Sequence, residues 1–144
     1  MADASNPIVT AVEYAERLAA LLANKNGAAF PRRQRDKNIL LRCIIQSLRI
    51  GKNCSEQELN EALLLWLSDY GSGIDVDHVT LRRYLVDEGY RMRAANGSGY
   101  NPSLTGHGRV ACEDAVAAID SDRVIQAERD AAAARSEKWR NAIL

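Results

Sequence analysis

The sequence has no regular cysteine pattern, no long apolar run and no excess of charge of either sign. Its three cysteines are odd in number and irregularly spaced, which fits a reducing cytoplasm better than a disulfide framework. No apolar run approaches the roughly 18 residues that a membrane span requires, and residues 1–10 lack the basic start and apolar core of a signal peptide. We therefore expect a cytoplasmic protein that has no membrane partner.

Residues that could support catalysis or metal binding are also scarce. The only histidines are His78 and His107, and no C-x-x-C motif is present, whereas a zinc site needs several convergent ligands. A catalytic pair of Cys54 with His78 would have no local sequence signature. The glycine-rich stretches lack the context of a phosphate-binding loop. We expect no catalytic residue, no metal site, no cofactor and no enzymatic activity.

The composition is sufficient for one folded domain with extensions. Hydrophobic residues make up 47% of the 144 residues and charged residues 26%, which is typical of a globular chain. The 19 basic and 19 acidic residues cancel, so the whole-chain charge neither supports nor excludes a nucleic-acid partner. The densest basic run, near residue 34, consists of Arg32, Arg33, Arg35 and Lys37.

Hydrophobic spacing predicts two helices in the first third of the chain. Residues 8–24 are expected to form a helix with a narrow apolar stripe made of Val12, Ala15, Ala19 and Leu22. A second helix is expected over residues 33–49, where the apolar surface is wider.

Capping signals predict the next two helices. Ser55 can accept a hydrogen bond from the third helical amide, and Glu58 can reach back to the Ser55 amide, which forms a capping box. Asp75 or Asp77 can cap a further helix that ends at Glu88, with Gly89 in the position that favours a left-handed backbone.

A β-hairpin is expected after these helices. Asn96-Gly97 is the strongest short-range hairpin signal in the chain, so residues 90–94 should pair with residues 99–101. The link over residues 50–54 can pair beside this hairpin as a third strand. The resulting order of helix, extended link, helix, turn, helix and hairpin is that of a winged helix-turn-helix.

The last third of the chain is rich in alanine and charge. Residues 109–119 and 121–142 each suit a helix, with a joint at residues 120–122, but their apolar stripe is thin. This segment should pack against the N-terminal helix or against a second subunit. Trp139 either packs back on the N-terminal helix, which we prefer, or anchors in a groove of a partner.

We therefore expect a mainly α fold with a small β-hairpin. It consists of an N-terminal helix (residues 1–29), a winged-helix-like domain (residues 30–101) and a C-terminal helical extension (residues 102–144).

Residues 30–100 resemble the bacterial family of domains of unknown function numbered two thousand and eighty-seven. The resemblance is carried by Phe30-Pro31 with the basic run after it, Ser55-Glu56, Glu58-Leu59-Asn60, Asp77, the run from Thr80 to Asp87, Gly89, Arg93, Gly97 and Tyr100. Members occur alone or joined to repressor-type winged helices and are often labelled transcriptional regulators. The resemblance thus implies a winged-helix-like regulatory domain, and it supplies no biochemistry that could be transferred.

Double-stranded DNA is the expected partner of this domain. On the helix before the hairpin, a spacing of 100° per residue puts Leu81, Tyr84 and Leu85 on one side. Arg82 is expected to lie across the domain surface, paired with an acidic side chain. Thr80 and Arg83 lie on a polar stripe and are the candidates for groove contacts. Arg91 and Arg93, on one face of the first hairpin strand, are expected to contact phosphate. Further phosphate contacts are expected from the basic run Arg32, Arg33, Arg35 and Lys37.

Two other expectations concern partners. A homodimer through the two terminal helices would place two DNA-reading helices for a palindromic site. The alternative function is a protein–protein interaction module that uses the same fold without nucleic acid. Convergence of Arg83, Arg91 and Arg93 on one exposed surface with the run from Arg32 to Lys37 favours DNA. Interleaving of Asp75, Asp77, Asp87 and Glu88 with these cations favours the interaction module.

Overall fold

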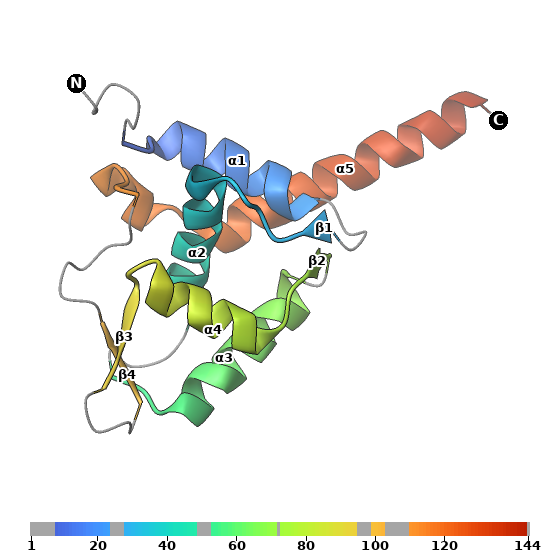
Figure 1. Cartoon of the computed structure of the whole chain (residues 1–144). Coiled ribbons are helices and arrows are strands. Elements are labelled where there is room, and N and C mark those ends of the chain that lie inside the picture. Colours follow the sequence, from blue (N-terminus) through green and yellow to red (C-terminus); the bar gives the residue numbers. More distant parts are fainter. Residues whose placement is uncertain are drawn as a thin grey trace.

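The fold is mainly helical with a small antiparallel hairpin, as the sequence predicts (Figure 1). The computed structural model describes residues 8–23, 28–48, 53–71, 73–94, 99–102 and 110–143. The helices are α1 (Ala11–Ala23), α2 (Gln34–Ser47), α3 (Glu56–Asp69), α4 (His78–Asp87), the 3-10 helix η2 (Asp114–Ala118) and α5 (Ser121–Ile143). The strands are β1 (Ala28–Ala29), β2 (Ile74–Asp75), β3 (Arg91–Arg93) and β4 (Tyr100–Pro102).

The antiparallel pair β3–β4 has the expected third member at one position. The Cys54 amide donates to the Tyr100 carbonyl at 3.0 Å, and the Tyr100 amide donates to the Cys54 carbonyl at 2.7 Å. β4 therefore lies between β3 and Cys54. A Cβ atom on Gly99 would lie 2.1 Å from the Cys54 carbonyl oxygen, so this close approach requires glycine. Residues 49–52 and the predicted Asn96-Gly97 turn lie outside the described residues.

The local signals that start α3 and those that start and end α4 are confirmed. The Glu58 amide donates to Ser55 Oγ at 3.0 Å and the Ser55 amide to Glu58 Oε1 at 2.9 Å, which completes the capping box. Asp77, and not Asp75, caps α4, since its Oδ1 accepts from the Thr80 amide at 2.7 Å. Gly89 has a φ of 88°, the backbone conformation expected just after the helix.

A second strand pair was not predicted from the sequence. β1 and β2 run parallel, with Ala28 opposite Ile74 and Ala29 opposite Asp75. This pair connects the segment before α2 with the segment before α4. It also brings Phe30 against Tyr84, with ring centroids 5.1 Å apart.

The first helix begins later and buries a different face than predicted. Val9 pairs with the segment around Cys112, so α1 begins at Ala11 rather than at residue 8. Val12 is 69% exposed, and the buried face consists of Tyr14, Leu18 and Leu22. The stripe predicted from Val12, Ala15, Ala19 and Leu22 is therefore wrong except at its last member.

The C-terminal extension also differs in part from the prediction. Residues 110–113 are extended and only Asp114–Ala118 form a 3-10 helix, so the predicted helix over 109–119 is wrong. The joint before Ser121 and the long helix after it are confirmed. The first half of α5 packs against α1 within the same chain, and its second half extends beyond the rest of the fold (Figure 1). Trp139 is 64% exposed, so the preference for packing on the N-terminal helix is wrong.

One apolar core joins all the helices. It includes Leu18 of α1, Leu40 and Ile44 of α2, Leu59 and Leu63 of α3, Leu81 and Leu85 of α4 and Ile125 of α5. Within the described residues, no helix is both long enough and apolar enough to cross a membrane.

Candidate nucleic-acid interface

The predicted orientation of α4 is confirmed by burial. Leu81 and Leu85 are fully buried, whereas Arg83 is exposed on the opposite side of the helix. Arg82 is half-buried and donates from Nη1 to Asn60 Oδ1 on α3. It thus lies across the domain surface, as expected, although its partner is an amide and not a carboxylate.

An open groove of about 260 Å³ separates the outer side of α4 from the hairpin. We call it the α4–hairpin groove, and it is lined by Val79, Arg82, Arg83, Val86, Asp87, Arg93 and Tyr100. Of the cations whose convergence would favour DNA, only Arg83 and Arg93 line this groove, and the carboxylate of Asp87 lies among its arginines.

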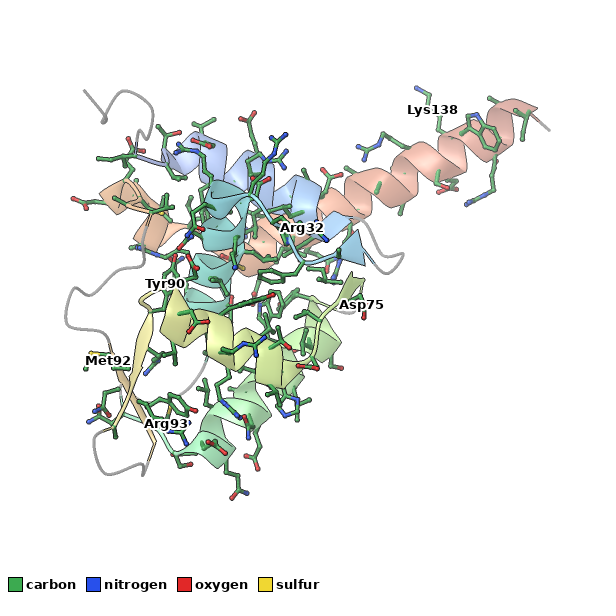
Figure 2. The ribbon with its side chains drawn as sticks, in the orientation of Figure 1. Arg32, Asp75, Tyr90, Met92, Arg93 and Lys138 are labelled. Carbon is green, nitrogen blue, oxygen red and sulfur yellow. The ribbon has the colours of Figure 1, made fainter. Side chains whose placement is uncertain are left out.

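Arg93 is held at the hairpin side of this groove. Its guanidinium lies 5.7 Å from the centre of the Tyr100 ring, and its Nη2 lies 3.5 Å from Glu56 Oε1. Figure 2 shows Arg93 on the hairpin next to the start of α3. Both side chains of this ion pair are about half exposed, so water screens it strongly.

Arg91 and Arg93 lie two positions apart on β3, as predicted for one face of the strand, but they differ in exposure. Only 8% of Arg91 is exposed. The Arg91 charge acts on the Cys54 thiol, so these two side chains lie near each other. Arg91 is therefore buried near Cys54 and does not line the α4–hairpin groove.

The basic run before α2 lies apart from this groove. Arg35 pairs with Glu13 of α1, and Lys37 lies 3.9 Å from Glu88 and 4.2 Å from the centre of the Tyr84 ring. Arg32 and Arg33 are exposed. The phosphate contacts of the run stay a prediction, but two of its four cations already have partners within the chain.

A second hollow of about 590 Å³ lies at the other end of α4. It is lined by Ala29, Phe30, Pro31, Arg32, Lys37, Asp75, Val76, Asp77, Thr80 and Tyr84. Thr80 thus lines this hollow and not the α4–hairpin groove, so Thr80 and Arg83 do not share one hollow. In Figure 2, Arg32 and Asp75 lie at the β1–β2 end of the fold, whereas Arg93 lies at the hairpin.

The described residues give no arrangement for metal or thiolate chemistry. No group of three or more His, Cys, Asp or Glu side chains among them could hold a metal ion. Burial raises the pKa of the Cys54 thiol, the opposite of what a nucleophilic cysteine requires. His107 lies outside the described residues.

Sequence reasoning missed two polar members of the α4–hairpin groove, Arg82 and Tyr100. Arg82 was assigned only to the domain surface, and Tyr100 was not assigned a role near Arg93. The contact between Tyr100 and Arg93 follows from strand register, since β3 and β4 pair these two residues directly. The sequence signal was the hairpin itself, which placed the two strands opposite each other.

Comparison with curated proteins and with solved structures gives no match. A family model does match, over residues 28–101, which is half of the chain. The match begins at β1 and ends within β4, so it covers α2, α3, α4 and both strands of the hairpin. The chain therefore belongs to the family described as "Uncharacterized protein conserved in bacteria (DUF2087)".

Proposed function

We propose that this protein is a non-catalytic, cytoplasmic DNA-binding protein of winged-helix type that acts in transcription regulation. The observation that carries the proposal is the α4–hairpin groove, where Arg82 and Arg83 of α4 meet Arg93 of β3. In helix-turn-helix proteins a helix enters the major groove, while neighbouring cationic groups fix its position on phosphates. The arginine fork matches phosphate oxygens geometrically.

The order of elements supports the same proposal. α2, the extended residue Cys54, α3, α4 and the β3–β4 hairpin follow one another along the chain. In such an arrangement α4 is the reading helix, with Arg83 as its most accessible cation. Arg93 would contact a phosphate from the hairpin.

The three arginines differ in how available they are for phosphate. Arg83 is exposed and has no ion-pair or hydrogen-bond partner among the described residues. To bind phosphate, Arg93 would give up its solvent-screened ion pair with Glu56, and Arg82 would give up its hydrogen bond to Asn60. We expect alanine substitutions to reduce DNA affinity in the order Arg83, Arg93, Arg82.

The test is fluorescence anisotropy of a labelled random duplex titrated with protein at about 50 and 200 mM salt. Neutralising three phosphates predicts that affinity falls about 40-fold over this range through counterion release. Arg83→Ala should lower the slope by about one and leave a fall of about 12-fold. Arg123→Ala, which removes an exposed arginine on α5 outside the groove, is the matched control and should leave the slope unchanged.

Two results would contradict DNA binding at this site. One is the absence of binding at 50 mM salt with micromolar protein. The other is binding whose affinity and salt slope are the same in Arg83→Ala, Arg93→Ala and Arg123→Ala.

A protein-interaction module is the second candidate, because a carboxylate and apolar side chains share the groove. Asp87 lies among the arginines, and Val79 is about half exposed. Asp87→Asn separates the two candidates. It removes a charge that repels phosphate, so it should strengthen DNA binding and steepen the salt slope. It should weaken a protein partner that pairs with this carboxylate.

A further inference from the structure

The second half of α5 is exposed on all sides. Every residue from 133 to 143 is exposed, including Trp139 at 64% and Ile143 at 62%. Figure 1 shows this end of α5 extending away from the other elements. Trp139 and Ile143 are four positions apart, so they lie on one face of the helix.

The charge of this helix end is positive. Between residues 133 and 143 there are three basic residues, Arg135, Lys138 and Arg140, and one acidic residue, Glu137. Figure 2 shows Lys138 on the projecting part of α5. Lys138 has no ion-pair partner among the described residues. A projecting helix with an exposed tryptophan gains most of its stability from packing against another surface.

An acidic, partly apolar groove of about 640 Å³ lies elsewhere on the same molecule. We call it the α3 groove. It is lined by Ser47, Leu48, Glu58, Glu61, Ala62, Leu65, Trp66, Asp69, Tyr70 and Asp122. Four of these residues are acidic and none is basic, and Leu65 is 63% exposed within it.

The α5 end and the α3 groove are complementary in charge and in polarity. Trp139 and Ile143 would cover Leu65, while Lys138 and its basic neighbours would face the groove carboxylates. The helix cannot fold back to make this contact within one chain. Asp122 lines the groove at the start of α5, and Trp139 lies 17 positions further along the same helix, roughly 25 Å away.

We propose that a second copy of this chain occupies the α3 groove with the end of its α5. Two copies exchange their α5 ends reciprocally, which closes a two-fold dimer with two identical contacts. This interface differs from the dimer expected through both terminal helices, because α1 is already packed against the first half of α5 in the same chain. The interface is also separate from the α4–hairpin groove, so it does not depend on DNA binding.

Sedimentation of the full-length chain over a range of concentrations tests the proposal. The wild-type chain should reach the mass of two chains and no more. Truncating one interface tryptophan typically weakens binding about 30-fold, so Trp139→Ala, which removes two per dimer, should raise the dissociation constant about 1000-fold. Leu65→Arg should also give monomers. Both residues are exposed in the monomer, so neither change should unfold it.

Val12→Asp is the matched control, because it changes an equally exposed apolar residue on α1 and should leave the dimer intact. A zero-length carbodiimide cross-link then identifies the contact. In the dimer band, mass spectrometry should find Lys138 joined to one of the groove carboxylates, Glu58, Glu61, Asp69 or Asp122.

Four results would overturn the proposal. They are a wild-type chain that remains monomeric, a dimer that survives Trp139→Ala, cross-links from Lys138 that reach no groove carboxylate, and assemblies that keep growing with concentration. The last result would mean a head-to-tail contact that does not close.

Discussion

A buried carboxylate holds the helix that carries Arg83 against α2, and its removal is the sharpest test of the fold. Glu88 is 7% exposed. It accepts hydrogen bonds from Gln34 Nε2 and, at 3.1 Å, from Asn38 Nδ2, and it lies 3.9 Å from Lys37 Nζ. The network continues to the hairpin, since the Tyr90 hydroxyl donates to Asn38 Oδ1 at 2.9 Å. Glu88 thus connects α2 to the junction of α4 and β3.

The stability that Glu88→Ala is expected to cost depends on which hydrogen-bond partners of Glu88 find other partners in the variant. Removing one partner of a buried ion pair costs about 3–5 kcal/mol where the other charge is left buried and unpaired, and Lys37 keeps some exposure to water. Gln34 is exposed and regains water, and Asn38 Nδ2 keeps its bond to the Gln34 carbonyl at 2.9 Å. We therefore expect Glu88→Ala to lower the free energy of unfolding by about 3 kcal/mol, at the lower end of that range. Glu88→Gln keeps an acceptor for Asn38 and should lose only about 1 kcal/mol.

Urea unfolding followed by circular dichroism measures both variants. Thermal unfolding should show a melting temperature lower by roughly 6–12 °C for Glu88→Ala. Glu16→Ala is the control, because Glu16 is exposed on α1 and has no partner among the described residues. The reasoning is refuted if Glu88→Ala destabilises the protein no more than Glu16→Ala, or if Glu88→Gln is as damaging as Glu88→Ala.

Three further predictions concern the capping box, an ion pair and the thiols. Ser55→Ala removes the side-chain cap of α3 and should cost about 1 kcal/mol in urea unfolding, and no loss would contradict the cap. Hydrogen bonds from Arg35 hold the pKa of Glu13 below its usual value of 4.5, so this pair stabilises the fold at neutral pH. The stability difference between wild type and Glu13→Gln should therefore shrink as the pH falls below 4.5, and a difference that grows would have the wrong sign. Burial raises the pKa of both the Cys43 and the Cys112 thiols, but Cys112 is less buried, so alkylation of the native protein followed by mass spectrometry should modify Cys112 before Cys43.

The parts of the fold that the sequence predicted are those with a local cause. The capping box at Ser55, the cap at Asp77 and the glycine after α4 each depend on residues within one turn of one another. The long helix after the joint near Ser121 follows from composition over many residues. The residues of each such signal lie close together in the sequence, so the signal can be recognised without knowledge of any tertiary contact.

The parts that it did not predict depend on contacts between distant segments. β1 and β2 have two residues each, too few for any alternation to be read. In α1, alanine fits a buried or an exposed face equally well, so spacing alone did not select the face. The hydroxyl of Tyr14 finds a partner in Ser121 Oγ at 3.2 Å, more than a hundred residues along the chain, and this allows an aromatic side chain with a polar tip to be fully buried.

The candidate site shows the same limit for charged residues. Spacing on α4 correctly separated Arg83 from the buried leucines, because helical periodicity is a local property. Alternation on β3 placed Arg91 and Arg93 on one face, but it could not show which of the two side chains the rest of the fold covers. The burial of Arg91 depends on tertiary contacts, since its charge acts on the Cys54 thiol, which lies some forty residues earlier in the chain.

Burial separates the cations that were predicted to bind DNA into two groups: those engaged within the fold and those available to phosphate. Only the second group supports the DNA proposal. Arg91, Arg35 and Lys37 are engaged within the fold. Releasing Lys37 from the buried carboxylate of Glu88 would disturb the network that positions α4. Arg93 differs, since its pair with Glu56 is half exposed and contributes at most about 1 kcal/mol, less than a charge-assisted bond to phosphate returns. The arginines of the α4–hairpin groove can therefore exchange their present partners for phosphate, while the buried cations maintain the shape of the groove.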